Sequence, residues 1–483
     1  MKKAGILMPV ASLPDRHGCG SFGKEAYRFI DRMKEAGLTI WQILPLNPLG
    51  YGNSPYQPYS SYAMDDIYLS LDILYERGLL SRRAPSYRRR SKQIDYDAVR
   101  RFRDPYLHEA YRNFRADMNY AAFSYQSWVR SYAIFMTFKK KNGMKCWLEW
   151  PEDEKNQPQE NGVDLKAYED EILYEAFLQY MLYLQWKDLK QYANDAGILI
   201  MGDIPFYVGI DSADVWADRS SFLLESDGRP SFIAGVPPDY FAKYGQRWGN
   251  PIYDWDYLQK TDFRFWLERL AYTDKMFDIT RVDHFRAFDT YWKIPSSCPT
   301  AVEGEWIEAP GYALFDVLFD KMPDMEIVAE DLGDLRYEVH VLRDHYNFRG
   351  MRVIQFSFDS SGMPEDREHL SVYTGTHDND PIFSWYRGFK PAVQRQMRHC
   401  LKRMGYDSGS FVHDVIRYSL HSAADMVIIP MADWLHKGHE ARLNTPGTVG
   451  APNWMWRMSE SGEFASVCGD IRRDLEEAGR IEE

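Results

Sequence analysis

Cysteine is scarce in this chain, and the few that occur form no motif. The 483 residues include five cysteines, at positions 19, 146, 298, 400 and 468, and no two of them have a Cys-x-x-Cys spacing. An odd number of scattered cysteines offers no zinc motif and is typical of proteins from a reducing compartment.

Long apolar runs are also missing. No segment contains 18 consecutive apolar residues, and the apolar stretch at Ala4–Val10 is interrupted by Pro9 and is too short for the hydrophobic part of a signal peptide. We therefore expect a cytoplasmic protein that is not associated with a membrane.

Positive charge is in deficit. The 58 Lys and Arg residues against 71 Asp and Glu give a net charge of −13, which argues against nucleic acid or an anionic membrane as the main partner. The one strongly basic stretch, at 82–90, could contact an anionic partner, but its composition favours a solvated loop face.

Aromatic residues are abundant instead. The 33 Tyr, 26 Phe and 15 Trp residues amount to 15% of the chain. Aromatic rings beside polar groups suit sugars, which present apolar ring faces surrounded by hydroxyls. On composition alone, a large aromatic core is the favoured explanation, so this signal needs support from motifs.

Eight segments rich in apolar and β-branched residues have the pattern of buried parallel strands. Amphipathic helical stretches separate most of them, for example Lys24–Glu35, Glu171–Asn194 and Ser410–Ser422. Eight such units predict an α/β fold, a (β/α)8 barrel, rather than an open doubly wound sheet. The strands are expected near 4–10, 38–46, 197–208, 277–285, 326–332, 351–358, 371–378 and 425–432.

The spacing between these strands is uneven. About 150 residues separate the second strand from the third, far more than a crossover helix requires. We predict one catalytic barrel spanning 1–483, with a mostly helical subdomain inserted at 49–165. A second helical insertion, at 209–260, follows the third strand and is expected to cover the active-site cleft as a lid.

Three acidic residues stand at the carboxyl ends of predicted strands. Asp283, Glu330 and Asp378 are 47 and 48 residues apart, and helical sequence separates their strands. A parallel barrel brings such strand ends to one mouth, where these folds place their chemistry. Three carboxylates can supply the nucleophile, the general acid/base and the substrate-stabilising group of glycosidic-bond cleavage.

The neighbours of these residues suggest different roles. Arg281 faces the same side of its strand as Asp283, and an adjacent arginine should lower the pKa of a carboxyl, as a nucleophile requires. A structural ion pair is the alternative. Glu330 follows Ile-Val-Ala and precedes Asp331, and both features should raise its pKa toward that of a working acid.

Two other motifs are weaker. Gly18–Gly23 matches Gly-x-Gly-x-x-Gly, but the second strand lacks the acidic residue that would hold a ribose, so no dinucleotide cofactor is expected. His436 and His439 resemble part of a zinc pattern, but no third ligand is evident. We expect neither a cofactor nor a metal.

Many ordered motifs make the chain resemble the amylomaltases, the 4-α-glucanotransferases or disproportionating enzymes of the α-amylase superclan. The resemblance runs nearly from end to end. Its motifs are Ser12–Pro14, Trp41–Pro45, Gly52–Tyr56, Gly202–Pro205, Asp211–Trp216, Ala234–Phe241, Gly245–Pro251, Arg281–Arg286, Ala329–Gly333, Tyr373–Asp380 and Arg442–Gly447.

This resemblance implies roles for individual residues. Asp283 would be the nucleophile, Glu330 the acid/base and Asp378 the stabiliser of the transition state. Tyr51 falls where the family can have a second, remote glucan-binding contact. The implied substrate-binding residues are Ser54, Tyr56, Asp203, Asp239, Gln246, Trp248, Arg281 and His377, of which Asp239, Gln246 and Trp248 belong to the acceptor side.

The resemblance also implies a reaction. The enzyme would transfer α-1,4-glucan segments by a retaining double displacement, from malto-oligosaccharides, amylose, starch or glycogen-derived glucans to another glucan or to glucose. An α-1,4-glucan hydrolase with the same three carboxylates is the first alternative. A sugar-binding protein on an inactive barrel is the second, and the intact set of carboxylates argues against it.

Overall fold

The computed structural model describes residues 2–87, 93–238, 243–358 and 367–481. Its centre is a sheet of eight parallel strands in the order β10-β11-β12-β1-β2-β3-β6-β9. The two outer strands approach each other through a parallel bridge between Val328 and Arg349, where the Ala329 amide donates a 2.7 Å hydrogen bond to the Arg349 carbonyl. The sheet is therefore a nearly closed barrel.

All eight predicted barrel strands are present, and the predicted fold class is confirmed. Each strand is shorter than its apolar segment, because the residues beyond its carboxyl end belong to the loops of the mouth. One assignment is wrong in part: the second half of 351–358 forms the short helix α14 (Ile354–Ser357), not strand. The strands are β1 Lys3–Leu7, β2 Ile40–Gln42, β3 Leu199–Ile204, β6 Ile279–Val282, β9 Ile327–Ala329, β10 Gly350–Val353, β11 Leu370–Tyr373 and β12 Met426–Pro430.

Helices surround the barrel and bury one face against it. In α1, the buried residues Ala26, Phe29, Ile30 and Met33 recur at helical spacing, and Gly37 ends the helix in the left-handed conformation with φ 80°. The helices around the barrel are α1 Lys24–Ala36, α8 Glu169–Asp195, α11 Arg264–Met276, α12 Gly311–Lys321, α13 Tyr337–His345, α17 Phe411–Leu420 and α20 Cys468–Glu477.

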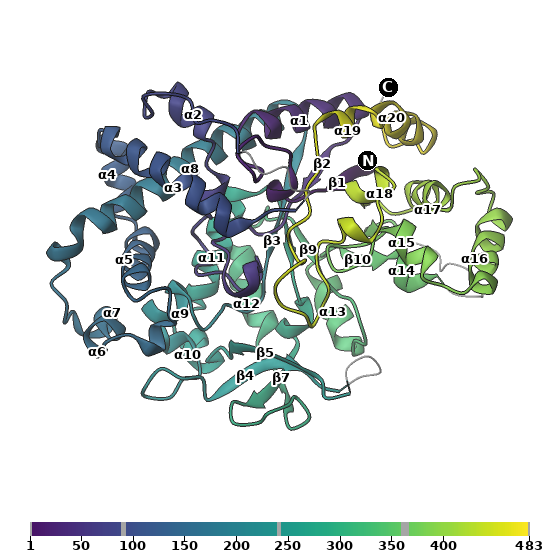
Figure 1. The fold of residues 1–483 in the computed structure, drawn as a ribbon. Helices are drawn as coiled ribbons and strands as arrows, with labels where there is room; N and C mark the ends of the chain where they lie inside the picture. The colour runs from purple at the N-terminus through teal and green to yellow at the C-terminus, as the bar shows by residue number, and fades with distance from the viewer. Residues whose placement is uncertain (1, 88–92, 239–242, 359–366, 482–483) are drawn as a thin grey trace.

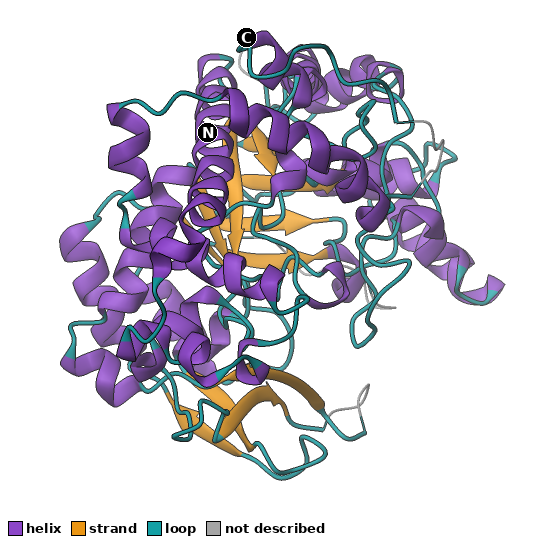
Figure 2. Cartoon of the chain, turned by 60° about the vertical axis from the view of Figure 1, so that its left-hand side comes forward, coloured by secondary structure: helices purple, strands orange, loops and turns teal. Residues whose placement is uncertain are grey.

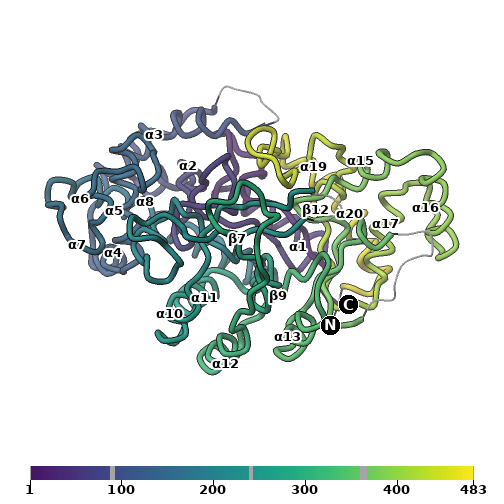
Figure 3. Tube along the Cα trace, turned by 90° about the horizontal axis from the view of Figure 1, so that it is seen from below, coloured from purple at the N-terminus to yellow at the C-terminus, as the bar shows by residue number. Residues whose placement is uncertain are grey.

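Other helices lie on two flanks of the barrel. The helices of the long segment after β2 gather on the left in Figures 1 and 3, and α15 (Ile382–Arg387) and α16 (Pro391–Arg403) lie on the right. The left flank contains α2 Leu71–Glu76, α3 Tyr96–Asn113, α4 Met118–Ser124, α5 Ser127–Lys141, α6 Glu152–Lys155 and α7 Gln157–Glu160. The others are α9 Ala213–Ala217, α10 Trp255–Lys260, α14 Ile354–Ser357, α15 Ile382–Arg387, α16 Pro391–Arg403, α18 Met431–Trp434 and α19 Gly462–Ala465.

The prediction that the insertion after the third strand is helical is wrong in part, because a second, smaller sheet takes two of its strands from this segment. This sheet is antiparallel, with the order β5-β4-β7-β8, and Figure 2 shows it apart from the barrel strands. Strands β4 Phe232–Val236 and β5 Gln246–Pro251 follow β3, whereas β7 Thr290–Pro295 and β8 Glu305–Glu308 follow β6. Because both pairs leave the carboxyl ends of barrel strands, the small sheet stands on the mouth side of the barrel.

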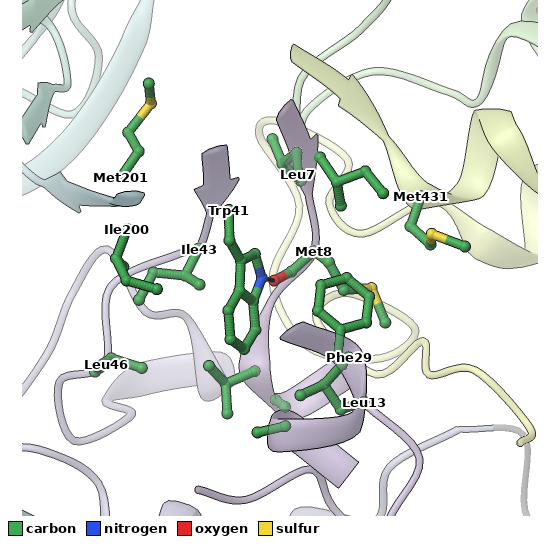
Figure 4. Packing of buried hydrophobic residues seen from close by; sticks show 14 of the residues in the cluster. Leu7, Met8, Leu13, Phe29, Trp41, Ile43, Leu46, Ile200, Met201 and Met431 are labelled. Carbon is green, nitrogen blue, oxygen red and sulfur yellow. Dashed lines mark hydrogen bonds between the residues drawn. The ribbon is translucent and has the colours of Figure 1, made fainter. Parts of the chain in front are cut away.

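The core beneath the mouth is packed with large side chains. Trp41 is fully buried between the barrel strands and α1, and its ring lies 5.0 Å from that of Phe29. Its indole Nε1 donates a 2.8 Å hydrogen bond to the Met8 carbonyl, which satisfies the ring's polar atom (Figure 4). A rigid base of this kind holds the strand ends, and therefore the polar residues of the mouth, in place.

Candidate active site

The three acidic residues predicted from the sequence follow the carboxyl ends of their barrel strands. Asp283 comes directly after β6, Glu330 directly after β9, and Asp378 lies in the loop after β11. The Asp283 amide donates to the Ile204 carbonyl at 3.0 Å, and the Glu330 amide donates to the Val282 carbonyl at 3.0 Å. Because of the parallel register, β3, β6 and β9 end at the same edge of the barrel. The residues that follow these strands therefore lie along that edge.

Arg281 is buried between two carboxylates. Its Nη1 lies 2.7 Å and 2.8 Å from the two carboxyl oxygens of Asp203, and its Nη2 lies 3.2 Å from Oδ1 of Asp283. The Asp203 side chain is fully buried, whereas 31% of the Asp283 side chain is exposed. Asp203 therefore anchors the guanidinium, and Asp283 presents its carboxylate to the open mouth.

The expected lowering of the Asp283 pKa is wrong. Burial raises the pKa of Asp283 more than Arg281 lowers it, and the charges of Asp203 and Asp378 add to the increase. The sequence shows that Arg281 is adjacent but not that Asp203, from another strand, takes both of the closer contacts. Arg281 still favours the ionised form of Asp283, but Asp203 and Asp283 share its positive charge.

Glu330 has the raised pKa that the sequence predicts. Burial, and next the charge of Asp283, raises the pKa of Glu330 to about 8, while Asp331 adds a smaller increase. Asp331 itself points elsewhere, since it accepts from the Met351 amide at 2.7 Å and pairs with Arg343. This shift favours the protonated form of the Glu330 carboxyl near neutral pH.

A backbone bend joins Glu330 to the residue after Asp283. His284 has φ 52°, in the left-handed region that a non-glycine residue seldom adopts. In this conformation its amide donates a 2.8 Å hydrogen bond to Glu330 Oε2, and the next amide, of Phe285, donates to the Glu330 carbonyl at 3.2 Å. The bend thus fixes the Glu330 carboxyl beside Asp283.

Tyr56 and His377 form another wall of the mouth. Their rings stack with centroids 4.8 Å apart, the Tyr56 hydroxyl donates to Asp203 Oδ2 at 2.7 Å, and it lies 3.2 Å from His377 Nδ1. Burial, together with the charge of Asp203, raises the pKa of Tyr56 well above its ordinary value, so the hydroxyl keeps its proton. Ser54 lies on the same loop, and its hydroxyl accepts from the Tyr56 amide at 3.2 Å.

Asp378 is held by the loop that contains the Arg442–Gly447 motif, for whose residues the sequence predicted no role. Asn444 donates from its side chain to Asp378 Oδ1 at 2.7 Å, and Arg442 donates to the Asp378 carbonyl at 2.8 Å. Asp378 also lies 3.5 Å from His377 Nε2. Trp454, likewise missed, lies with its ring 5.7 Å from that of Tyr56. The Arg442–Gly447 motif was the available signal for Asn444.

Two predicted acceptor-side residues lie on β5 of the small sheet. Trp248 places its ring 4.9 Å from that of His284, nearly at a right angle, and its Nε1 donates to Gln246 Oε1 at 3.1 Å. The small sheet therefore contacts the mouth immediately beside Asp283. Asp239 lies outside the described residues.

The sequence also singled out Tyr51, His439 and the basic stretch at 82–90. Tyr51 is 74% exposed, on the loop that carries Ser54 and Tyr56. His439 pairs with Asp380 through a 2.6 Å contact, and Arg83 of the basic stretch pairs with Glu76 at 3.2 Å. Within the described parts of the chain, no helix has both the length and the apolar character needed to cross a membrane.

Fold and mouth together define a class: a (β/α)8-barrel enzyme with its charged residues at the carboxyl ends of the strands. A family model described as 4-alpha-glucanotransferase matches residues 8–462. The chain therefore belongs to the 4-alpha-glucanotransferase family and is a glycosyl-transferring enzyme.

Relatives match over nearly the whole length. The 4-alpha-glucanotransferase of Thermus thermophilus is 39% identical over 493 residues, which cover 98% of each chain. The enzyme of the same name from Clostridium butyricum is 39% identical, over 98% of this chain and 100% of its own. The solved amylomaltase of Streptococcus agalactiae, a complex with acarbose, superposes with a TM-score of 0.93 at 34% identity, covering all of both chains.

Proposed function

We propose that this enzyme transfers α-1,4-glucan segments by a retaining double displacement in which Asp283 is the nucleophile and Glu330 the acid/base. The observation that carries the proposal is the contrast between these carboxyls. Asp283 lies 3.2 Å from the Arg281 guanidinium, which favours its ionised form. Glu330, with its pKa raised to about 8, holds a proton at neutral pH. In its ionised form Asp283 can attack as a nucleophile, and in its protonated form Glu330 can donate a proton.

In the first step, a carboxylate oxygen of Asp283 attacks the anomeric carbon of the donor glucan. The glycosidic carbon–oxygen bond breaks, and Glu330 gives its proton to the departing oxygen. A glycosyl ester forms on Asp283, and Glu330 becomes ionised.

In the second step, Glu330 accepts the proton of the 4-hydroxyl of an acceptor. The acceptor oxygen displaces Asp283 from the anomeric carbon, and the new α-1,4 bond has the configuration of the old one after two inversions. Both carboxyls return to their starting states, which makes the cycle balanced in protons.

The other mouth residues bind the sugar. Asp378, oriented by Asn444, would accept hydrogen bonds from ring hydroxyls and help to flatten the sugar toward the oxocarbenium shape. Arg281 and His377 would donate to the same ring, with Ser54, Tyr56 and Asp203 lining the pocket.

Trp248 and Gln246 belong to the acceptor side in this proposal. An aromatic ring and an amide beside His284 can bind a sugar ring and exclude water from the ester. Asp239 on the same side, and Tyr51 as a second glucan contact, stay predictions from the resemblance. Donors would be malto-oligosaccharides, amylose, starch or glycogen-derived glucans, and acceptors would be glucans or glucose.

The product profile from maltotriose tests the reaction. Transfer produces glucose together with maltopentaose and longer chains. Glucose and maltose in equal yield would instead identify a hydrolase, and no product at all would leave only sugar binding. Either of these results overturns the proposal.

A further inference from the structure

A large cavity lies away from the mouth, on the flank formed by the inserted helices. It has a volume of about 620 Å³ and is lined by α5, α9, α11 and residues of the 60–62 segment, with none of the mouth residues described above in its lining. Helices α5, α9 and α11 can be followed on the left of Figure 1. Small-molecule sites have volumes of roughly 300–1,000 Å³, so this cavity could hold a short oligosaccharide.

One wall of the cavity is aromatic. The rings of Tyr62 and Trp128 are nearly parallel, with an interplanar angle of 15° and centroids 6.0 Å apart. Tyr272 contacts both, at 5.4 Å from Tyr62 and 5.3 Å from Trp128. Such a wall offers ring faces to the apolar CH groups of a sugar.

Some polar side chains of the cavity are already paired, namely Asp214 with Ser61, Asp218 with Ser221 and Gln126 with Trp128, but others among the described residues are not. Within the described residues, the side chains of Arg264, Glu268 and Lys275 make no hydrogen bond or ion pair. The hydroxyl of Tyr272 is shielded from solvent and has no hydrogen-bond partner there. The cavity thus offers both donors and acceptors, as a neutral polyhydroxyl ligand requires.

The cavity is held in shape by buried contacts. Asp214, itself buried, accepts from the Ser61 amide at 2.9 Å and from the Ser61 hydroxyl, and the Ala213 amide donates to the Tyr59 carbonyl at 2.8 Å. These bonds attach the 59–62 segment to α9. The wall therefore exists before any ligand arrives, which lowers the entropy lost on binding.

We infer that this cavity is a non-catalytic glucan site, separate from the contact predicted for Tyr51, that binds an α-1,4-glucan chain through Trp128, Tyr62 and Glu268. The occupant is the substrate class of the enzyme, because aromatic faces with mixed donors and acceptors match neutral sugars better than anions or hydrocarbons. A long chain would bind here and also supply donor segments at the mouth, which raises its effective concentration. The inference does not depend on the roles assigned to Asp283 and Glu330.

Two variants test the site: Trp128→Ala, which removes the aromatic face, and Glu268→Ala, which removes an exposed acceptor without a partner. Tyr125→Ala is the matched control, since Tyr125 is 78% exposed, lies three residues before Trp128 and is not part of the lining. Binding is measured as retardation in gels containing amylose, and kcat/KM is measured on amylose and on maltotriose.

We expect Trp128→Ala to weaken retardation and kcat/KM on amylose about fivefold, and Glu268→Ala about threefold. Maltotriose turnover and the Tyr125→Ala variant should stay within about twofold of the wild type. If Trp128→Ala lowers the melting temperature, its weaker binding could reflect lost stability. The result for Glu268→Ala then tests the site, because alanine at an exposed helix position is well tolerated and should leave the stability unchanged. Retardation of Glu268→Ala equal to that of the control, or equal losses on both substrates, would overturn the inference. Failure of transfer on maltotriose would refute the proposed reaction and leave the binding result intact.

Discussion

The His284 amide donates a 2.8 Å hydrogen bond to Oε2 of Glu330, so the residue that follows the proposed nucleophile holds the proposed acid/base. Two strands that are 47 residues apart in the chain are thereby connected at the point where the two carboxyls must cooperate. The left-handed bend at His284 is the local feature that makes this contact possible.

Asp283→Asn should abolish transfer, with a loss of about 10⁴-fold or more in kcat, because the amide cannot form the glycosyl ester. The side chain keeps its size, so the melting temperature and most of the glucan binding should be retained. Transfer from maltotriose is the measurement, with the exposed Asp274→Asn on α11 as control. Retention of a tenth of wild-type activity would place the nucleophile elsewhere.

Glu330→Gln should stop turnover of ordinary glucans, since the departing sugar oxygen would leave without a proton. A donor with an activated leaving group, such as α-glucosyl fluoride, needs no such proton and should still form the ester on Asp283. Mass spectrometry of the protein should then detect an added glucosyl group. If no such species accumulates in this variant, Glu330 is not the acid/base.

The pH dependence follows from the raised pKa of Glu330. Because burial and Asp283 raise that pKa to about 8, the acid form is lost and kcat/KM should fall as the pH rises through about 8. In the unfolded chain the same group titrates near about 4.3. Between these values the folded protein binds the extra proton, so its stability decreases with rising pH, and below about 4.3 both states are protonated.

Glu330→Gln removes this dependence, because the amide stays neutral and can still accept from the His284 amide. The melting temperature of the variant relative to the wild type should therefore increase from pH 5 to pH 8. Glu225→Gln, an exposed turn residue, is the control and should show no such trend. A constant difference across this range would mean that Glu330 is not buried in its neutral form.

Trp248→Ala should raise the ratio of hydrolysis to transfer and weaken acceptor use more than donor cleavage. The ring contacts His284 beside Asp283, so its removal should admit water to the glycosyl ester. Glucose release and chain lengthening from maltotriose, measured together, determine the ratio. If Trp248 only packs the small sheet against the barrel, rate and melting temperature would fall together at a constant ratio.

Part of this architecture could be predicted because local sequence patterns specify it. Eight apolar segments alternate with amphipathic helices, and this alternation is enough to predict the barrel and the shared mouth of Asp283, Glu330 and Asp378. The antiparallel sheet could not be predicted in this way. Its strands β4 and β7 pair between residues about 60 positions apart, and another strand of the sheet, β5, begins with polar, glycine-containing sequence.

The sequence by itself determined that Asp283 and Glu330 directly follow barrel strands, because the apolar run before each one sets the end of its strand. It also determined that Glu330 would have a raised pKa, since an apolar strand carries it. Only the tertiary structure decided how the charges are shared. Asp203 takes the closer contacts of Arg281, Asn444 orients Asp378, and the pKa of Asp283 is raised despite the adjacent arginine. Electrostatic energies depend on distance and burial in three dimensions, and residues from separate strands and loops set both.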